Sequence, residues 1–224
     1  MIGVILKGHD YKYEVAELIK LFTTDFEFIE EKSFGRILEN VVLVYNDTLI
    51  AKTKYYENYE LKYEFADHIE IKGFNEQELK KATKETIKRT MFKVLQNRLN
   101  TYVPWGILTG IRPVKIVHTL LDKEMDEAQI REILKEKYYI MDEKIDLALD
   151  IAKRERVFMY PIDENKISLY VSIPFCPTRC YYCSFPANPI KQFGHLKKQY
   201  VEKIIEEIKG LAKIIKDTNK EIET

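Results

Sequence analysis

The sequence predicts an α+β protein that ends in the first strand and helix of a further α/β domain. Short apolar and alternating runs fill the first seventy residues, and a helical period replaces them from Asn75. Near residue 166 a second alternating segment begins, and a helical pattern follows it. We therefore expect a small α/β sheet domain over 1–74, a helical region over 75–160 and the first strand and helix of a further α/β domain over 161–224.

The first part is predicted to be a small sheet with one helix against it. An apolar run at 3–7 suggests a strand, and residues 13–22 carry apolar side chains at helical spacing. Asn46-Asp47 lies between two strand-like runs and is a hairpin signal. Further strands are predicted at 26–29, 41–45, 49–54 and 59–65.

The second part is predicted to be helical. Asn75, followed by Gln77 and Glu78, is a plausible N-terminal cap for a long helix whose apolar stripe continues to Leu99. Prolines and glycines interrupt the pattern after residue 100, and residues 161–165 are typical of a linker. Between these breaks, three shorter helices are expected near 114–121, 127–137 and 143–156.

The third part should begin with a strand over 167–173, because aliphatic residues alternate there with Ser168, Tyr170 and Ser172. A helix from about 194 to 216 follows. We expect its apolar stripe to pack on the aliphatic face of the strand, as in one βα unit of a parallel barrel. The stripe consists of Leu196, Tyr200, Ile204, Ile208, Leu211 and Ile215.

Composition excludes several broad classes of protein. The 224 residues are 46% hydrophobic and 32% charged, which fits a globular protein, and no apolar run is long enough to span a bilayer. Lys plus Arg and Asp plus Glu each total 36, so no overall field attracts nucleic acid or anionic membrane. The N-terminus lacks the features of a signal peptide. We expect a cytoplasmic protein with neither a membrane nor a nucleic acid as partner.

The cysteines point to a metal centre. None occurs in the first 175 residues, and then Cys176, Cys180 and Cys183 fall within one loop. Three thiolates can hold three irons of a [4Fe–4S] cube and leave the fourth iron open to a substrate or cosubstrate. Structural zinc is the alternative, with His195 as the nearest spare ligand, but such sites usually use paired CxxC spacing. We favour the cluster.

The cysteine spacing, with Tyr182 before the last cysteine, resembles the signature of the radical-SAM superfamily. Residues 170–176, YVSIPFC, resemble the opening of the oxygen-independent coproporphyrinogen III oxidases and their relatives, including a haem-chaperone branch. Residues 108–115, LTGIRPVK, resemble the coproporphyrinogen dehydrogenase branch. The resemblance implies a radical-SAM α/β barrel, of which this chain would carry only the start.

The resemblance also implies ligands for particular residues. Cys176, Cys180 and Cys183 would ligate the [4Fe–4S] cluster, and S-adenosyl-L-methionine (SAM) would chelate its fourth iron. Tyr182 would lie beside the adenine or its ribose, and Tyr170 would contact SAM from the first barrel strand. The implied activity is the oxidative decarboxylation of coproporphyrinogen III to protoporphyrinogen IX in haem biosynthesis. The implied partners are the tetrapyrrole substrate and an electron donor such as flavodoxin or ferredoxin.

Two departures from the oxidase pattern leave alternatives open. The oxidases have histidine at the position of Ser172, and the best-known ones have a further cysteine at the position of Phe185, where the haem-chaperone branch also has phenylalanine. A haem-binding chaperone and a radical-SAM enzyme with another substrate therefore remain possible. Only 41 residues follow Cys183, whereas an eight-unit barrel takes about 250 residues. We expect this chain to be an N-terminal part that is inactive alone.

The loop at 105–112 is a weaker candidate site. Arg112 offers a cation for substrate carboxylates, but a loop rich in Trp, Pro and Gly is more often structural. We favour the structural role.

Overall fold

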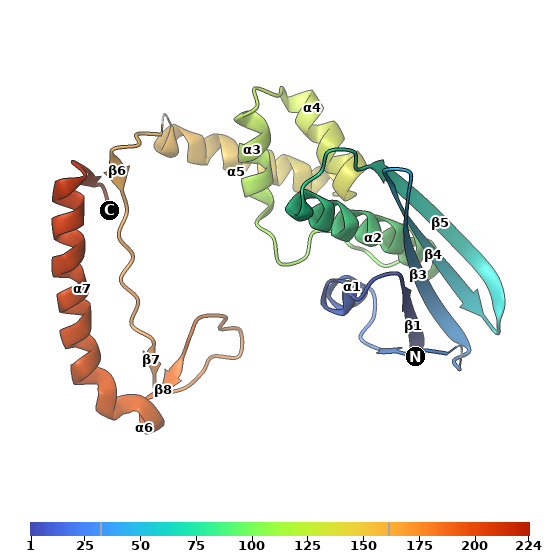
Figure 1. The fold of residues 1–224 in the computed structure, drawn as a ribbon, viewed down its shortest axis with the longest axis horizontal. Coiled ribbons are helices and arrows are strands. Elements are labelled where there is room, and N and C mark those ends of the chain that lie inside the picture. Colours follow the sequence, from blue (N-terminus) through green and yellow to red (C-terminus); the bar gives the residue numbers. More distant parts are fainter. Residues whose placement is uncertain (32, 161) are drawn as a thin grey trace. The chain divides into compact units, whose positions relative to one another are not determined.

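The computed structural model describes residues 1–31, 33–160 and 162–224 and contains two compact units, 1–155 and 156–224 (Figure 1). Pro161, the first residue of the predicted linker, lies outside the described residues. None of the described helices is long and apolar enough to cross a membrane.

The first unit is built on a mixed five-stranded sheet with the strand order β2-β1-β3-β4-β5 (Figure 1). Strands β2 and β3 pair with β1 in parallel, whereas β4 pairs with β3 and β5 in antiparallel fashion. The predicted α+β class is confirmed. The strands are β1 (Ile2–Lys7), β2 (Phe26–Phe28), β3 (Arg36–Tyr45), β4 (Thr48–Glu57) and β5 (Glu60–Glu70).

Two tight turns join the antiparallel strands. Asn46 and Asp47 connect β3 to β4 with φ angles of 45° and 58°, as a two-residue hairpin turn of primed type requires. The predicted hairpin is confirmed. The second turn uses Asn58 and Tyr59, with φ angles of 50° and 67°. The prediction that a strand begins at Tyr59 was wrong by one residue, because a tyrosine gives no signal for the left-handed conformation that this turn imposes.

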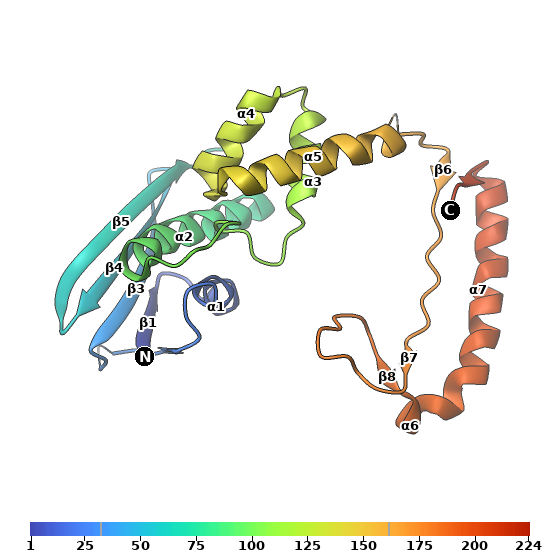
Figure 2. The same ribbon diagram turned by 180° about the vertical axis from the view of Figure 1, so that it is seen from behind.

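Two helices, α1 (Lys12–Ile19) and α2 (Glu76–Leu99), pack against the sheet, where the sequence predicted one. Figure 2 shows both helices on the same side of the strands. Helix α2 buries Ile87, Met91 and Leu95 in the core that the strands and α1 also form, so it stabilises the sheet directly. The fully buried contributions of α1 to this core are Val15, Leu18 and Ile19.

Helix α2 begins with the predicted cap. The Asn75 Oδ1 atom accepts a hydrogen bond from the Glu78 backbone N–H (2.9 Å), and Glu78 Oε2 accepts one from the Asn75 N–H (2.9 Å). This reciprocal pair is a capping box.

Replacing Asn75 by alanine should lower the free energy of unfolding by about 1 kcal/mol, because the Glu78 N–H loses its acceptor. Chemical denaturation measures the change. The matched control is Gln77→Ala, in the same exposed turn but outside the capping box, and it should be nearly neutral. Equal effects of the two substitutions would show that the cap contributes nothing.

The helical part of the first unit follows α2. Three short helical segments were predicted, and all three are present, although the second changes character along its length. Helix α4 continues into the π-helical segment η1, whose Leu134 is fully buried. A second core forms here from side chains of all these helices, with Val117, Ile130 and Ile145 at its centre. The elements are α3 (Pro113–Leu121), α4 (Glu127–Glu132), η1 (Ile133–Lys137) and α5 (Asp142–Met159).

The second unit differs from the prediction at its first strand. Only β6 (Lys166–Ile167) forms where a strand over 167–173 was predicted, and residues 168–174 have no regular structure. That prediction was wrong because alternation shows which faces a strand would have, but a ladder also needs a partner. The partner β9 pairs with two residues, and one further backbone hydrogen bond joins the Leu169 N–H to the Thr224 carbonyl (2.7 Å). The other elements are β7 (Phe175–Cys176), β8 (Asn188–Pro189), α6 (Ile190–Phe193), η2 (Gly194–Leu196), α7 (Lys197–Asp217) and β9 (Glu221–Ile222).

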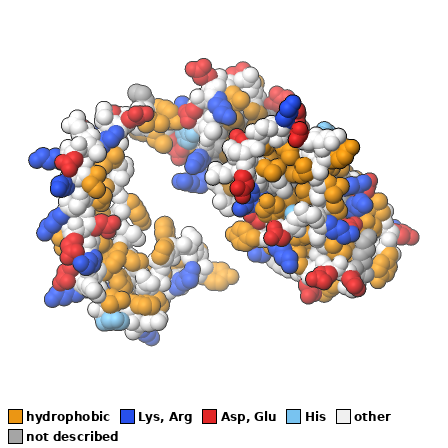
Figure 3. All heavy atoms as spheres, viewed as in Figure 1, with side chains coloured by type: hydrophobic (Ala, Val, Ile, Leu, Met, Phe, Trp, Pro, Cys, Tyr) orange, Lys and Arg blue, Asp and Glu red, His pale blue; other side chains and the backbone are white. Residues whose placement is uncertain are grey.

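The predicted helix of this unit is confirmed as η2 and α7. Strands β6 and β9 are parallel, with Lys166 opposite Glu221, and α7 lies between them in the chain, as in a β-α-β connection. The predicted packing of the helix stripe is only partial. Leu196, Ile208 and Leu211 of the stripe stay exposed, and so do the aliphatic side chains of 168–173. Figure 3 shows apolar side chains at the surface of this part of the chain. The barrel itself stays a prediction.

Candidate metal centre

The cysteines lie on a loop that two short strands close at its base. Strand β7 pairs in parallel with β8, with Phe175 opposite Asn188 and Cys176 opposite Pro189. The Asn188 N–H also donates to the carbonyl of Pro174 (2.6 Å). Because these bonds join the two ends of the loop, residues 177–187 project from a fixed base (Figure 1).

The three thiols differ in placement. Cys176 is half-buried on β7, Cys180 is exposed in the loop, and Cys183 is half-buried after a turn. In that turn the Cys183 N–H donates to the Cys180 carbonyl (3.0 Å). All three are free thiols. Within the described part of the chain, however, no three His, Cys, Asp or Glu side chains are gathered closely enough to hold a metal ion.

The donor set nevertheless fits an iron–sulfur cluster by its chemistry. Free cysteines supply the soft anionic ligands that iron–sulfur clusters use, and here three of them share one loop. A cluster held by all three thiols would require them to lie closer together than they do in this structure. The zinc alternative would need His195 as a fourth ligand. This side chain is exposed and does not lie together with the thiols in the described residues.

The two tyrosines predicted to contact SAM are both exposed. Tyr170, in the irregular segment before the loop, is 81% exposed, and Tyr182, in the turn between Cys180 and Cys183, is 88% exposed. Their positions leave both rings available to a ligand. The predicted roles of these residues stay predictions.

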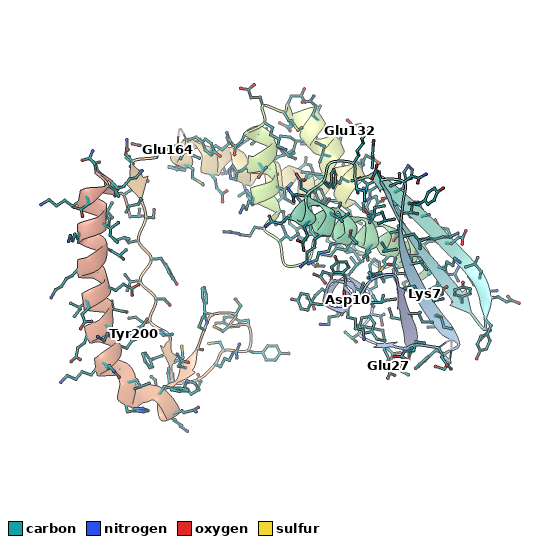
Figure 4. All side chains as sticks on the ribbon, viewed as in Figure 1. Lys7, Asp10, Glu27, Glu132, Glu164 and Tyr200 are labelled. Carbon is teal, nitrogen blue, oxygen red and sulfur yellow. The ribbon has the colours of Figure 1, made fainter. Side chains whose placement is uncertain are left out.

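Sequence analysis missed the role of Tyr200, which it placed in the apolar stripe of α7. The Tyr200 hydroxyl donates to the Ser172 carbonyl (2.6 Å), and its ring packs edge-on against Phe175 with centroids 5.2 Å apart. Figure 4 shows Tyr200 on α7 beside the segment that leads to the cysteine loop. Tyr200 therefore ties α7 to the base of the loop. Helical periodicity alone gives no signal for this hydrogen bond.

A cavity of about 430 Å³ adjoins the same base. It is largely apolar and is bounded by the first residue of β7, the first residue of β8 and the start of α7. Its lining residues are Pro174, Phe175, Asn188, Phe193, Leu196, Gln199, Tyr200 and Lys203.

His9 and His118 of the first unit have ordinary side-chain partners. The His9 Nε2 atom is hydrogen-bonded to Asn40 Oδ1 (2.8 Å), and burial lowers the pKa of His9. His118 Nε2 lies 2.8 Å from the Glu155 carboxylate. Arg112 is the exposed residue before α3.

Comparison with known proteins gives one informative similarity. Over 119 residues, or 52% of this chain, the sequence is 41% identical to the oxygen-independent coproporphyrinogen-III oxidase-like protein HemZ of Bacillus subtilis (strain 168). The chain is similar to HemZ. The predicted resemblance is thereby confirmed. The match covers 24% of HemZ, so the chain spans about a quarter of the length of this curated relative. No family model and no solved structure matches the chain.

Proposed function

We propose that the loop of Cys176, Cys180 and Cys183 holds a [4Fe–4S] cluster in a radical-SAM enzyme that acts on a tetrapyrrole. The observation that carries this proposal is the set of three free cysteines on one loop, directly after an extended segment and before a helix. The similarity to HemZ, whose name describes an oxidase-like protein, supports an oxidoreductase of porphyrin metabolism.

The residues of this chain would bind and orient the cofactors. Cys176 would provide one ligand from β7, and Cys180 and Cys183 would provide two from the loop between β7 and β8. Tyr170 and Tyr182 would contact SAM through their exposed rings. When bound, the cluster supplies a single electron to SAM, and the radical chemistry belongs to these cofactors, whereas the protein supplies position and electrostatics.

The proposed reaction is the oxidative decarboxylation of coproporphyrinogen III, with flavodoxin or ferredoxin as electron donor. The proposed location is the cytoplasm. The exposed aliphatic side chains of 168–173 and of α7 support the proposed barrel, because a parallel sheet normally buries such faces under helices.

A second candidate function is a haem-binding chaperone. Phe185 favours it, because this exposed side chain lies two residues after Cys183, where the best-known oxidases carry a further cysteine and the haem-chaperone branch has phenylalanine. Ser172, at the position of an oxidase histidine, is a second departure from the oxidase pattern.

One experiment separates these functions. The protein at its natural length is purified anaerobically, reconstituted with iron and sulfide, and incubated with dithionite, SAM and coproporphyrinogen III. We expect 5′-deoxyadenosine together with decarboxylated porphyrinogen, detected by chromatography. Stoichiometric haem binding without these products would support the chaperone. Formation of 5′-deoxyadenosine with neither decarboxylation nor haem binding would indicate another substrate.

A further inference from the structure

A cavity of about 370 Å³ opens in the first unit between the N-terminal half of α2 and the segment that follows residue 106. Its volume lies within the range of small-molecule sites, about 300–1,000 Å³. One wall carries lysines, and the other carries aliphatic side chains. The apolar wall consists of Ile107, Leu108 and Ile111, with Tyr138 beside them.

Four lysines of α2 line the cavity at increasing depth. Lys80 and Lys81 are exposed, Lys84 is half-buried, and Lys88 is only 9% exposed. Lys80, Lys84 and Lys88 are spaced by four residues, so they lie in one row along the helix. Sequence analysis missed this row, although its spacing is the signal that could have revealed it.

The charges of the cavity are incompletely balanced. One carboxylate, Glu85, occurs among the described lining residues, and it already forms an ion pair with Lys137 (2.9 Å). Lys84 forms an ion pair with Glu14. Among the described residues, Lys80, Lys81 and Lys88 have no carboxylate within ion-pair distance.

Among the lysines of the cavity, the buried Lys88 gives the strongest reason to expect an anion. Its Nζ donates to Thr109 Oγ1 (2.7 Å), a neutral acceptor, and burial lowers the pKa of Lys88. Glu14, Glu17 and Glu85 raise the pKa of Lys88 from beyond ion-pair distance, so the buried ammonium has no carboxylate in direct contact and an anion beside it would be stabilised. Thr109 belongs to the 108–115 segment, which contributes no residue to the cysteine loop.

We propose that this cavity binds a small organic anion, with a carboxylate or phosphate held by Lys84 and Lys88 and an apolar body against Ile107, Leu108 and Ile111. The two anionic groups share the chemistry that an ammonium recognises, and the apolar wall selects ligands with a hydrocarbon part. The proposal adds a ligand contact to the 105–112 loop, for which the sequence favoured a structural role. It does not depend on the proposed function of the cysteine loop.

The test uses anilinonaphthalene sulfonate, a probe with an anionic group on an aromatic body, and the whole chain. Trp105 is the single tryptophan, and its carbonyl accepts a hydrogen bond from the N–H of cavity residue Leu108 (3.2 Å), so energy transfer from Trp105 reports binding here. Lys88→Met should weaken binding about tenfold or more, because it removes a buried ammonium at nearly constant side-chain size. The exposed Lys115, on α3 and outside the cavity, gives the matched control Lys115→Met, which should bind normally.

A second variant avoids any effect on folding. Ile111 is 50% exposed, so Ile111→Asp places a negative charge at the cavity without disturbing a core, and it should also weaken binding. The uncharged N-phenylnaphthylamine should bind more weakly than the sulfonate. Competition by octanoate or by octyl phosphate identifies the preferred anion. Unchanged affinity in both cavity variants, equal binding of the uncharged probe, or competition by neither anion would overturn the proposal.

Discussion

Replacing Cys176, Cys180 and Cys183 together by alanine is expected to abolish the uptake of iron and sulfide during anaerobic reconstitution. The chain contains three cysteines in all, so the variant has no thiolate left to hold a cluster. Iron analysis and the broad visible absorption of iron–sulfur charge transfer measure the effect. The unchanged protein should bind four irons and four sulfides per chain if each chain holds one cube.

The matched control is Ser184→Ala, next to Cys183 in the same exposed loop. It removes a hydroxyl but no thiol, so cluster uptake should be unchanged. Full iron uptake by the triple variant would contradict the cluster site. Zinc bound by the unchanged protein, with no iron taken up by either form, would favour the structural zinc alternative.

Replacing Gly106 by alanine is expected to lower the free energy of unfolding by about 3 kcal/mol or more. Gly106 has a φ of +56°, in the left-handed region that favours glycine, and an added Cβ would overlap the backbone of Tyr138 and Tyr139. Next to Gly106, the Ile107 N–H donates a hydrogen bond to the Tyr138 carbonyl (3.0 Å). The substitution must therefore break this junction between the two cores of the first unit.

Gly110→Ala separates backbone strain from overlap. Gly110 has a φ of +64°, but no described atom lies within 4 Å of the Cβ position. Gly110→Ala should lower the free energy of unfolding by about 1–2 kcal/mol, the cost of a left-handed alanine alone. Urea denaturation of both variants compares them directly. Equal losses would show that the close approach at Gly106 relaxes without cost.

Local signals in the sequence predicted the elements whose geometry is set by neighbouring residues. The Asn46-Asp47 turn and the Asn75 cap are of this kind, because each depends on residues within a few positions. The segment at 167–173 is the opposite case. Its alternation defines two faces, but a strand also requires a partner along its length, and β9 supplies one for two residues only.

The candidate sites show the same division. The spacing of the cysteines is a local property, and it predicted their common loop without predicting how far apart the thiols lie in it. The burial of Lys88 depends on the segment that carries Thr109, 21 residues away. The four-residue spacing of the lysines indicates a row on the helix, but a lysine in a charged helix is normally exposed, so the sequence does not predict that the fold places this row against an apolar wall.

Mössbauer spectroscopy of the protein at its natural length, reconstituted with iron-57, tests most directly whether three cysteines hold a cube with one open iron. We expect a four-iron cluster in which one iron differs from the other three and alone changes when SAM is added, because only that iron lacks a cysteine ligand. The Mössbauer parameters of the three irons held by thiolates should stay the same when SAM is added. Absence of a four-iron cluster, or a spectrum that SAM leaves unchanged, would contradict the account.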